Sequence, residues 1–178
     1  MGTRLTEKSI SAGYYYLGLG PKNAFWHIIS YCFGDNDFES NNVEKIQEAL
    51  KRHNLVVSDF IHSCFFKWDS SDTNIIRGTE IINSDLARLI FESDLVVLNG
   101  GNNKHKTGTL DYLNKYFDCE STILTQQKEK GINDYGYIRL NGKLIKYVSL
   151  FSSSGANTHM SVDGKKHIWM KTICTYAK

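Results

Sequence analysis

Apolar residues recur every three or four positions in several segments of the chain, the spacing that places side chains on one face of an α-helix. The first such stripe is Phe25, Ile28, Ile29 and Phe33, and it follows a loop that contains Pro21. Asn41 or Asn42 could cap the second helix. The pattern predicts helices over residues 24–33, 43–53, 81–92, 107–117 and 165–176.

Two short apolar runs lack helical spacing and predict buried strands. The first is Leu55-Val56-Val57-Ser58-Asp59, and the second, Leu95-Val96-Val97-Leu98, is followed by Asn99-Gly100-Gly101. Continuous apolar runs of this length are typical of strands in a parallel sheet that is covered on both faces. Residues 137–151 contain Asn141-Gly142, the strongest short signal for a hairpin turn between two strands.

Helical and strand patterns alternate along the chain, which predicts an α/β fold. We expect residues 1–178 to form a single-domain three-layer sandwich, with a mostly parallel central sheet, helices on both faces and a hairpin insertion. Ligands of such sheets bind at the carboxyl ends of the strands. The polar residues that close the apolar runs should therefore line one crevice. They are Ser58, Asp59, Asn99, Gly100 and the segment 152–157.

Composition limits the classes of function. The chain has 178 residues, 41% of them hydrophobic, and a net charge of only +2, so any nucleic-acid contact must come from local patches. The apolar runs are too short to cross a membrane, and the N-terminus lacks the apolar segment of a secretory signal. We expect a cytoplasmic monomer with no membrane partner. The four cysteines lack the paired spacing of zinc or redox sites, which favours buried free thiols and no metal or cofactor.

Four segments, in order, resemble the signature of the uracil-DNA glycosylase superfamily, in the branch of mismatch-specific uracil and hypoxanthine glycosylases. The first segment contains Gly2-Thr3, Tyr14-Tyr15-Tyr16 and Pro21-Lys22-Asn23-Ala24-Phe25-Trp26. The second is Leu55-Val56-Val57-Ser58-Asp59-Phe60, followed downstream by Cys64 and Asp69. The third is Leu98-Asn99-Gly100, and the fourth, Leu150-Phe151-Ser152-Ser153-Ser154-Gly155-Ala156-Asn157, resembles the family's DNA-clamping loop.

The resemblance implies a single-domain enzyme that flips a base out of DNA and hydrolyses its N-glycosidic bond. It implies that Asn23 positions the attacking water, that Tyr15 or Tyr16 stacks on the base and that Phe25 forms the pocket floor. Contacts with the base edge would come from Ser58, Asp59 and Asn99. Contacts with DNA phosphates would come from Ser152, Ser153, Ser154, Gly155 and Asn157, and from Lys104 and Lys106 ahead of a helix.

Each of these residue types also has a purely structural interpretation. Asn23 could simply cap the following helix, and Asp59 could cap the next turn. Asn99 with its two glycines could form an ordinary tight turn. Lys104 and Lys106 could belong to a solvated surface run.

Several departures from the family pattern bear on the substrate. Many relatives carry a catalytic Asp or Asn shortly after the first strand's glycine, but that stretch here is Thr3-Arg4-Leu5-Thr6-Glu7. Met1 directly precedes Gly2, so we expect that the family's first strand is absent or that the start codon has been misjudged. Phe151 replaces a proline of the clamping loop. The stretch before Pro21 is two residues longer than in relatives, and a longer loop can reshape the pocket.

We therefore expect hypoxanthine, or a hypermodified pyrimidine of phage DNA, to be removed faster than plain uracil; the second substrate would imply antiviral defence. The loop could instead move outward and leave a standard uracil pocket. The runner-up is a catalytically weak or inactive member of the same fold that binds DNA or nucleotides. A flavodoxin-like binder would need a glycine-rich phosphate loop after the first strand, and none is present there.

Overall fold

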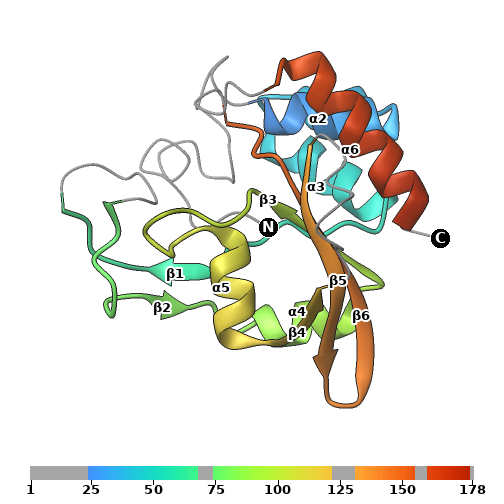
Figure 1. The fold of residues 1–178 in the computed structure, drawn as a ribbon. Coiled ribbons are helices and arrows are strands. Elements are labelled where there is room, and N and C mark those ends of the chain that lie inside the picture. The colour runs from blue at the N-terminus through green and yellow to red at the C-terminus, as the bar shows by residue number, and fades with distance from the viewer. Residues whose placement is uncertain (1–23, 68–73, 122–130, 155–159, 177–178) are drawn as a thin grey trace. The chain divides into compact units, whose positions relative to one another are not determined.

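The structure is a computed structural model that describes residues 24–67, 74–121, 131–154 and 160–176 (Figure 1). The described residues fall into two compact units. Unit 1 contains those within 58–152, and unit 2 contains those within 24–57 together with 153–176. The prediction of one single-domain sandwich is not confirmed.

Unit 1 contains a four-stranded sheet in the order β3 (Leu95–Asn99), β6 (Lys143–Leu150), β5 (Ile132–Leu140) and β4 (Asp118–Ser121). The β3 and β6 strands run parallel, whereas β6 with β5 and β5 with β4 are antiparallel. A second, antiparallel sheet joins β1 (Ile61–Ser63) to β2 (Ile81–Ile82). The mixed α/β class was predicted correctly, but the expectation of a mostly parallel sheet was wrong.

The Asn141-Gly142 turn explains why the sheet is mostly antiparallel. Both residues have positive φ, 49° and 79°, as a tight turn of the mirror-image type requires. Leu140 pairs with Lys143 across this turn, and the two strands it joins form the middle of the sheet. The predicted hairpin is thus confirmed, but it is central to the sheet and not an insertion into a parallel one.

The expected buried strand over residues 55–59 does not form. Leu55, Val56 and Val57 have no regular structure, and Val56 is 68% exposed. The reason lies in the end of the preceding helix: Asn54 turns the chain with a φ of 51°, and the Leu55 N–H donates to the Leu50 carbonyl at 2.8 Å. The backbone at the start of this run therefore completes a helix terminus.

The helix predicted over residues 81–92 begins later, as α4 (Leu86–Glu92). Ile81 pairs instead with Ser63 in the small sheet. Between strand and helix, the Asn83 side chain accepts from the Asp85 N–H at 3.0 Å, and the Asn83 carbonyl accepts from the Leu86 N–H at 3.1 Å. This side-chain turn competes with helix formation and delays the start of the helix.

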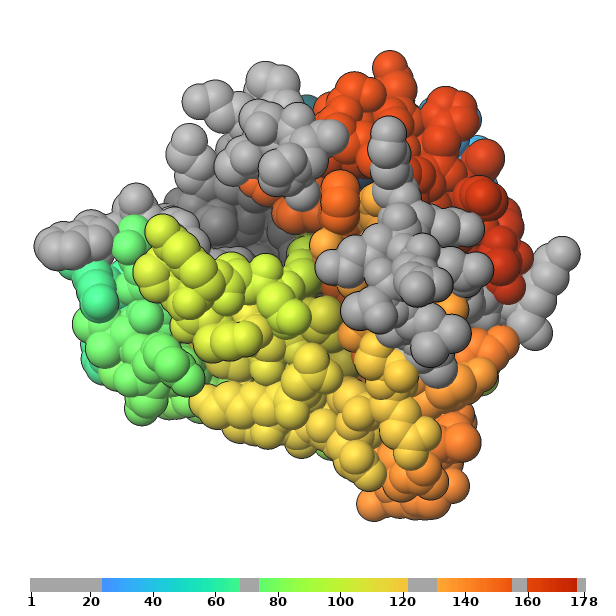
Figure 2. Space-filling view, in the orientation of Figure 1, coloured from blue at the N-terminus to red at the C-terminus, as the bar shows by residue number. Residues whose placement is uncertain are grey.

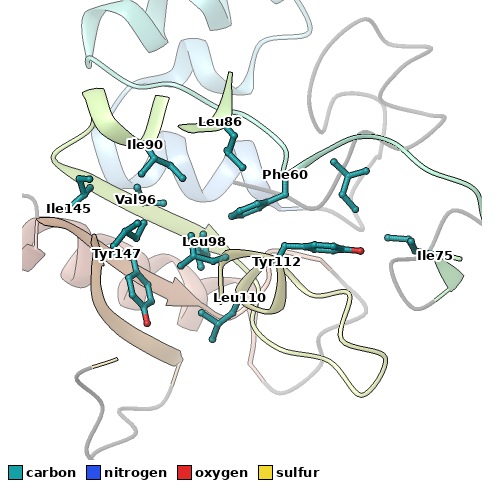
Figure 3. Close-up of a cluster of buried hydrophobic side chains, with 13 residues drawn as sticks. Phe60, Ile75, Leu86, Ile90, Val96, Leu98, Leu110, Tyr112, Ile145 and Tyr147 are labelled. Atoms are coloured by element: carbon teal, nitrogen blue, oxygen red, sulfur yellow. The ribbon is translucent and has the colours of Figure 1, made fainter. Parts of the chain in front are cut away.

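Unit 1 contains a large cluster of buried hydrophobic side chains (Figure 3). Val96 and Leu98, which alternate along β3 and so share one face of the sheet, belong to it. Leu86 and Ile90 of α4 join the same cluster, as do Leu110 and Leu113 of α5 (Thr109–Tyr116). The prediction of a helix near residues 107–117 is confirmed. Since both helices of unit 1 bury side chains in this one cluster, the prediction of helices on both faces is not confirmed.

Unit 2 is helical, with α2 (Phe25–Phe33), η2 (Asn36–Glu39), α3 (Val43–Arg52) and α6 (Val162–Tyr176). The α2 helix packs against both α6 and η2, and η2 packs against α3. The Asn42 side chain accepts from the Glu44 N–H at 2.8 Å, which confirms one of the two predicted caps. The three helices predicted for these segments are confirmed.

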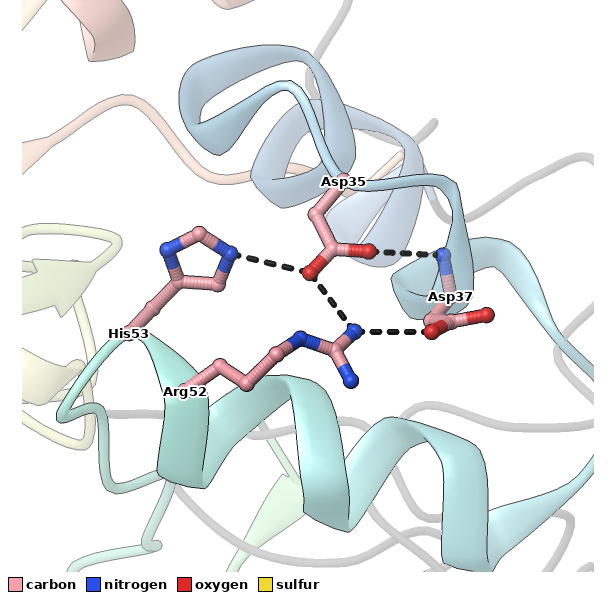
Figure 4. Close-up of polar contacts among 4 residues, drawn as sticks. All are labelled: Asp35, Asp37, Arg52 and His53. Atoms are coloured by element: carbon pink, nitrogen blue, oxygen red, sulfur yellow. Dashed lines mark hydrogen bonds and ion pairs between the residues drawn. The ribbon is translucent and has the colours of Figure 1, made fainter.

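A polar network links η2 to the end of α3 (Figure 4). The Arg52 guanidinium donates to carboxylate oxygens of Asp35 and Asp37, at 2.8 and 2.7 Å, and His53 Nε2 lies 2.9 Å from Asp35. The hydrogen bond from Arg52 is the main factor that lowers the pKa of Asp35 to about 2. The folded state thus holds the ionised form of Asp35 more strongly than the unfolded chain does.

Because the pKa of Asp35 is lower in the folded state, its contribution to stability should be present above the ordinary carboxyl pKa of about 4 and lost as the pH falls to about 2. Asp35→Asn should therefore reduce the free energy of unfolding at pH 7, with a loss that shrinks between pH 4 and pH 2. Urea unfolding across this range measures the difference, with Glu48→Gln, an exposed carboxylate on α3, as the control. A loss that is constant with pH would show that the ion pairs of Asp35 do not stabilise the fold.

Candidate functional site

The carboxyl ends of the parallel strands β3 and β6 lie side by side in unit 1. Asn99 pairs with Leu150 in register, and the Gly100 N–H donates to the Leu150 carbonyl at 3.0 Å. The Ser149 hydroxyl donates to the Gly100 carbonyl at 2.6 Å. Two of the four segments that carry the family resemblance, Leu98-Asn99-Gly100 and the segment leading into the serine loop (Ser152–Ser154), are therefore joined directly at this edge. That these residues line one crevice stays a prediction.

Gly100 allows the backbone to come close to two polar residues. Its φ of +125° is one that other residues rarely adopt, and a Cβ built there would lie 3.3 Å from the Thr109 hydroxyl oxygen and 3.9 Å from Ser152 Cβ. Thr109 is only 2% exposed, and within the described residues its hydroxyl oxygen has no hydrogen-bond partner. The edge thus combines a closely packed glycine backbone with a buried hydroxyl that still has hydrogen-bonding capacity.

Asn133 supports this edge from the neighbouring strand β5. Its side-chain amide donates to the Leu150 carbonyl at 2.9 Å, and a Cβ on Gly101 would lie 2.8 Å from the Asn133 side chain. Asn133 was not among the residues proposed from the sequence. It lies before the predicted hairpin region, residues 137–151, and no pattern in the sequence indicated which strand end it would meet.

The segment between β3 and α5 lies at the surface, in yellow-green in Figure 2. Lys104 and Lys106 are exposed on it. Asp111, in the first turn of α5, accepts from the backbone N–H groups of Asn103 and Gly108, at 2.8 and 3.1 Å. Backbone N–H groups before a helix N-terminus are typical phosphate ligands, but here the Asp111 carboxylate already occupies two of them. Phosphate binding by Lys104 and Lys106 would have to depend on their side-chain charges.

Ser58 and Asp59 are buried, at 3% and 4% exposure. The Asn83 side chain donates to the Ser58 hydroxyl at 3.0 Å and to the Asp59 carbonyl at 3.3 Å. Both residues precede β1 of the small sheet, whereas the sequence analysis placed them at the end of a parallel strand. That placement was wrong, because the apolar run before them completes a helix terminus. A base-contacting role for either residue stays a prediction.

The serine loop contacts the first resemblance segment within unit 2. The Ala24 N–H, at the start of α2, donates to the Ser153 carbonyl at 3.3 Å. Phe25 is 5% exposed and packs edge-on against Trp26 and Trp169, with ring centroids 4.9 and 6.2 Å away. Phe25 is therefore a core aromatic at the start of α2, and its role as a pocket floor stays a prediction.

Lys165 on α6 was missed by the sequence analysis. It is 2% exposed, and its Nζ donates to the Ser154 carbonyl at 3.0 Å. Burial lowers the pKa of this lysine, because the charged ammonium loses hydration. Lys165, Trp169 and Thr172 are all buried at helical spacing. Extending the predicted apolar stripe one turn towards the N-terminus would have shown that Lys165 shares the buried face.

The remaining predicted site residues lie outside the described part of the chain. They are Asn23, Tyr15, Tyr16, Gly155 and Asn157. Their roles stay predictions.

Three findings from the described residues bear on the expectations from composition. None of the helices within the described residues is long and apolar enough to cross a membrane. The same residues contain no group of three or more histidine, cysteine or acidic side chains that could hold a metal ion. All four cysteines are free, but Cys174 is exposed and the others are partly buried, so the prediction of buried thiols was too strong. Burial raises the pKa of Cys32 and Cys119 to about 12, which leaves both thiols protonated at neutral pH.

Comparisons of the chain with protein-family models, curated proteins and solved structures find no match.

Proposed function

We propose that the chain is a monofunctional DNA glycosylase that flips a modified or deaminated base out of DNA and hydrolyses its N-glycosidic bond. One observation carries the proposal: the segments Leu98-Asn99-Gly100 and Leu150-Phe151-Ser152 end adjacent parallel strands and are joined by the hydrogen bond from Gly100 to Leu150. A base-binding edge and a DNA-gripping loop in this family would have to lie together in this way. The mixed sheet differs from the expected one, but it keeps this parallel pair.

The edge of unit 1 has groups that suit a flipped base. A base presents a row of hydrogen-bond donors and acceptors, and it needs backbone and short polar side chains that approach closely. Asn99 closes β3 with a side-chain amide, and Thr109, beside Gly100, has a hydroxyl with hydrogen-bonding capacity left. An amide and a hydroxyl do not titrate near neutral pH, so we expect binding of the base edge by these side chains to be independent of pH in that range.

The proposed reaction needs few catalytic groups. The oxygen of a water molecule bonds to C1′ of the sugar as the bond from C1′ to the base nitrogen breaks, and the base departs with the bonding electrons and gains a proton. The sugar passes through a positively charged state, so positioned water and binding of the departing base lower the barrier. Asn23 would orient the water through its amide, and the Ser152–Ser154 loop would hold the DNA phosphates beside the flipped nucleotide.

The substrate is tested by comparing initial rates on matched duplexes that carry uracil, hypoxanthine or glucosylated hydroxymethylcytosine, followed by alkaline cleavage at the abasic sites. We expect hypoxanthine or the modified cytosine to be removed fastest, because contacts with the larger base can contribute binding in the transition state. Uracil as the fastest substrate would contradict the expected pocket. Binding of the duplexes without any cleavage would favour an inactive DNA-binding protein of the same fold.

A further inference from the structure

The buried lysine of unit 2 has no part in the reaction outlined above. A lysine is seldom buried completely, because its ammonium must give up hydration for whatever partners the protein provides. At 2% exposure, Lys165 is as deeply buried as the tryptophan one turn further along α6. One partner of its Nζ is the carbonyl of Ser154, in the loop proposed to grip DNA.

The serine loop is held from two elements of the same unit. The start of α2 donates to the Ser153 carbonyl through Ala24, and α6 donates to the next carbonyl, that of Ser154, through Lys165. Ser153 itself is 1% exposed. Two successive carbonyls are therefore fixed by donors on separate helices, which restricts the backbone of the loop where it must match the spacing of DNA phosphates.

We propose that Lys165 is the positioning residue of the serine loop and that its hydrogen bond to Ser154 keeps the loop in the conformation that binds a DNA phosphate. This inference rests on the proposed DNA-binding function of the loop. It assigns Lys165 an indirect role, because the lysine acts through the loop backbone and does not contact the DNA.

The test is binding of the full-length protein to a duplex with an abasic-site analogue, measured by fluorescence anisotropy at several salt concentrations. Lys165→Met keeps an unbranched side chain only one heavy atom shorter and removes the donor and the charge. Lys165→Gln keeps an N–H donor without the charge. Lys166→Met is the matched control, since it removes a charge from the next residue of α6, whose Nζ lies 3.4 Å from Asp163.

We expect Lys165→Met to weaken binding by about tenfold or more at every salt concentration, the effect of one lost hydrogen bond to a charged group. Lys165→Gln should recover much of the affinity, and Lys166→Met should bind like the wild type. The slope of affinity against salt should stay unchanged in all variants, because no phosphate contact is removed.

Two results would overturn the inference while leaving the proposed function intact. One is wild-type affinity in a folded Lys165→Met variant. The other is equal weakening by Met and Gln with a smaller salt slope, which would make Lys165 a direct phosphate contact. Failure of the wild-type protein to bind the duplex would instead contradict the proposed function, and the inference with it.

Removal of the buried charge lessens a desolvation cost, so Lys165→Met should fold. Urea unfolding checks this expectation. If Lys165→Met is unfolded, Lys165→Leu offers a second apolar side chain for the same comparison.

Discussion

Replacing Asn23 by alanine should lower the single-turnover rate of base excision by about 10²-fold or more, the usual effect of removing one positioned catalytic group. Asn23 directly precedes Ala24, the first described residue, whose N–H donates to the Ser153 carbonyl. The α2 helix begins at Phe25 with Ala24 at its N-cap position. The cap position is therefore taken by the residue after Asn23, which weakens the interpretation of Asn23 as a helix cap.

Asn42→Ala provides the matched control for this prediction. The Asn42 side chain does cap a helix, through its bond to the Glu44 N–H. Its replacement should cost about 1 kcal/mol of stability and leave the excision rate unchanged. If Asn23→Ala behaves in the same way, with lower stability and a normal rate, then Asn23 has a structural role and the proposed water-positioning role is wrong.

Gly108→Ala should destabilise unit 1 by roughly 2 kcal/mol or more, the upper part of the range for inserting atoms into a closely packed site. A Cβ at this position would lie 2.0 Å from the backbone carbonyl oxygen of Gly101. Backbone must then move, and with it the Gly108 N–H that donates to Asp111. Urea unfolding of the purified variant measures the loss.

Two further alanine substitutions in the same loop show whether the loss of stability comes from this clash or from any alanine placed in the loop. Gly101→Ala would contact the Asn133 side chain, which can move, so it should cost less than Gly108→Ala. Asn102→Ala, at an exposed position, should be nearly neutral. Equal stability of the three variants would show that the loop backbone is not closed as tightly as the structure indicates.

Local signals predicted the local structure well. Asn141-Gly142 predicted the hairpin correctly because few other residue pairs adopt two positive φ angles. Asn42 predicted the start of α3 correctly because its own side chain accepts a hydrogen bond from the first turn of that helix. The apolar stripes predicted the helices correctly for the same reason, because the 3.6-residue spacing of apolar side chains is a property of the segment itself. The start of α4 was missed because Asn83 forms a competing turn through side-chain hydrogen bonds.

Strand pairing could not be predicted from the same signals. The apolar run of residues 95–98 does form a strand with a parallel neighbour, β6, but nothing in the run shows that β6 in turn pairs antiparallel with β5. Residues 55–57 are equally apolar, but the left-handed conformation of Asn54 directs the Leu55 N–H to the end of α3. Lys165 was overlooked because a lysine in an amphipathic helix is usually exposed, and only its tertiary contact with Ser154 reveals its burial.

Glycosylase activity is tested by detecting the free base. The purified protein is incubated with a duplex that contains hypoxanthine, and the products are analysed by mass spectrometry before any alkali is added. We expect one equivalent of released hypoxanthine for each abasic site, with both DNA strands unbroken, and loss of the hypoxanthine signal in Asn23→Ala. If no base is released from this duplex or from those with uracil and glucosylated hydroxymethylcytosine, although the protein binds them, the chain is not a glycosylase for these bases and the proposed catalytic function is contradicted.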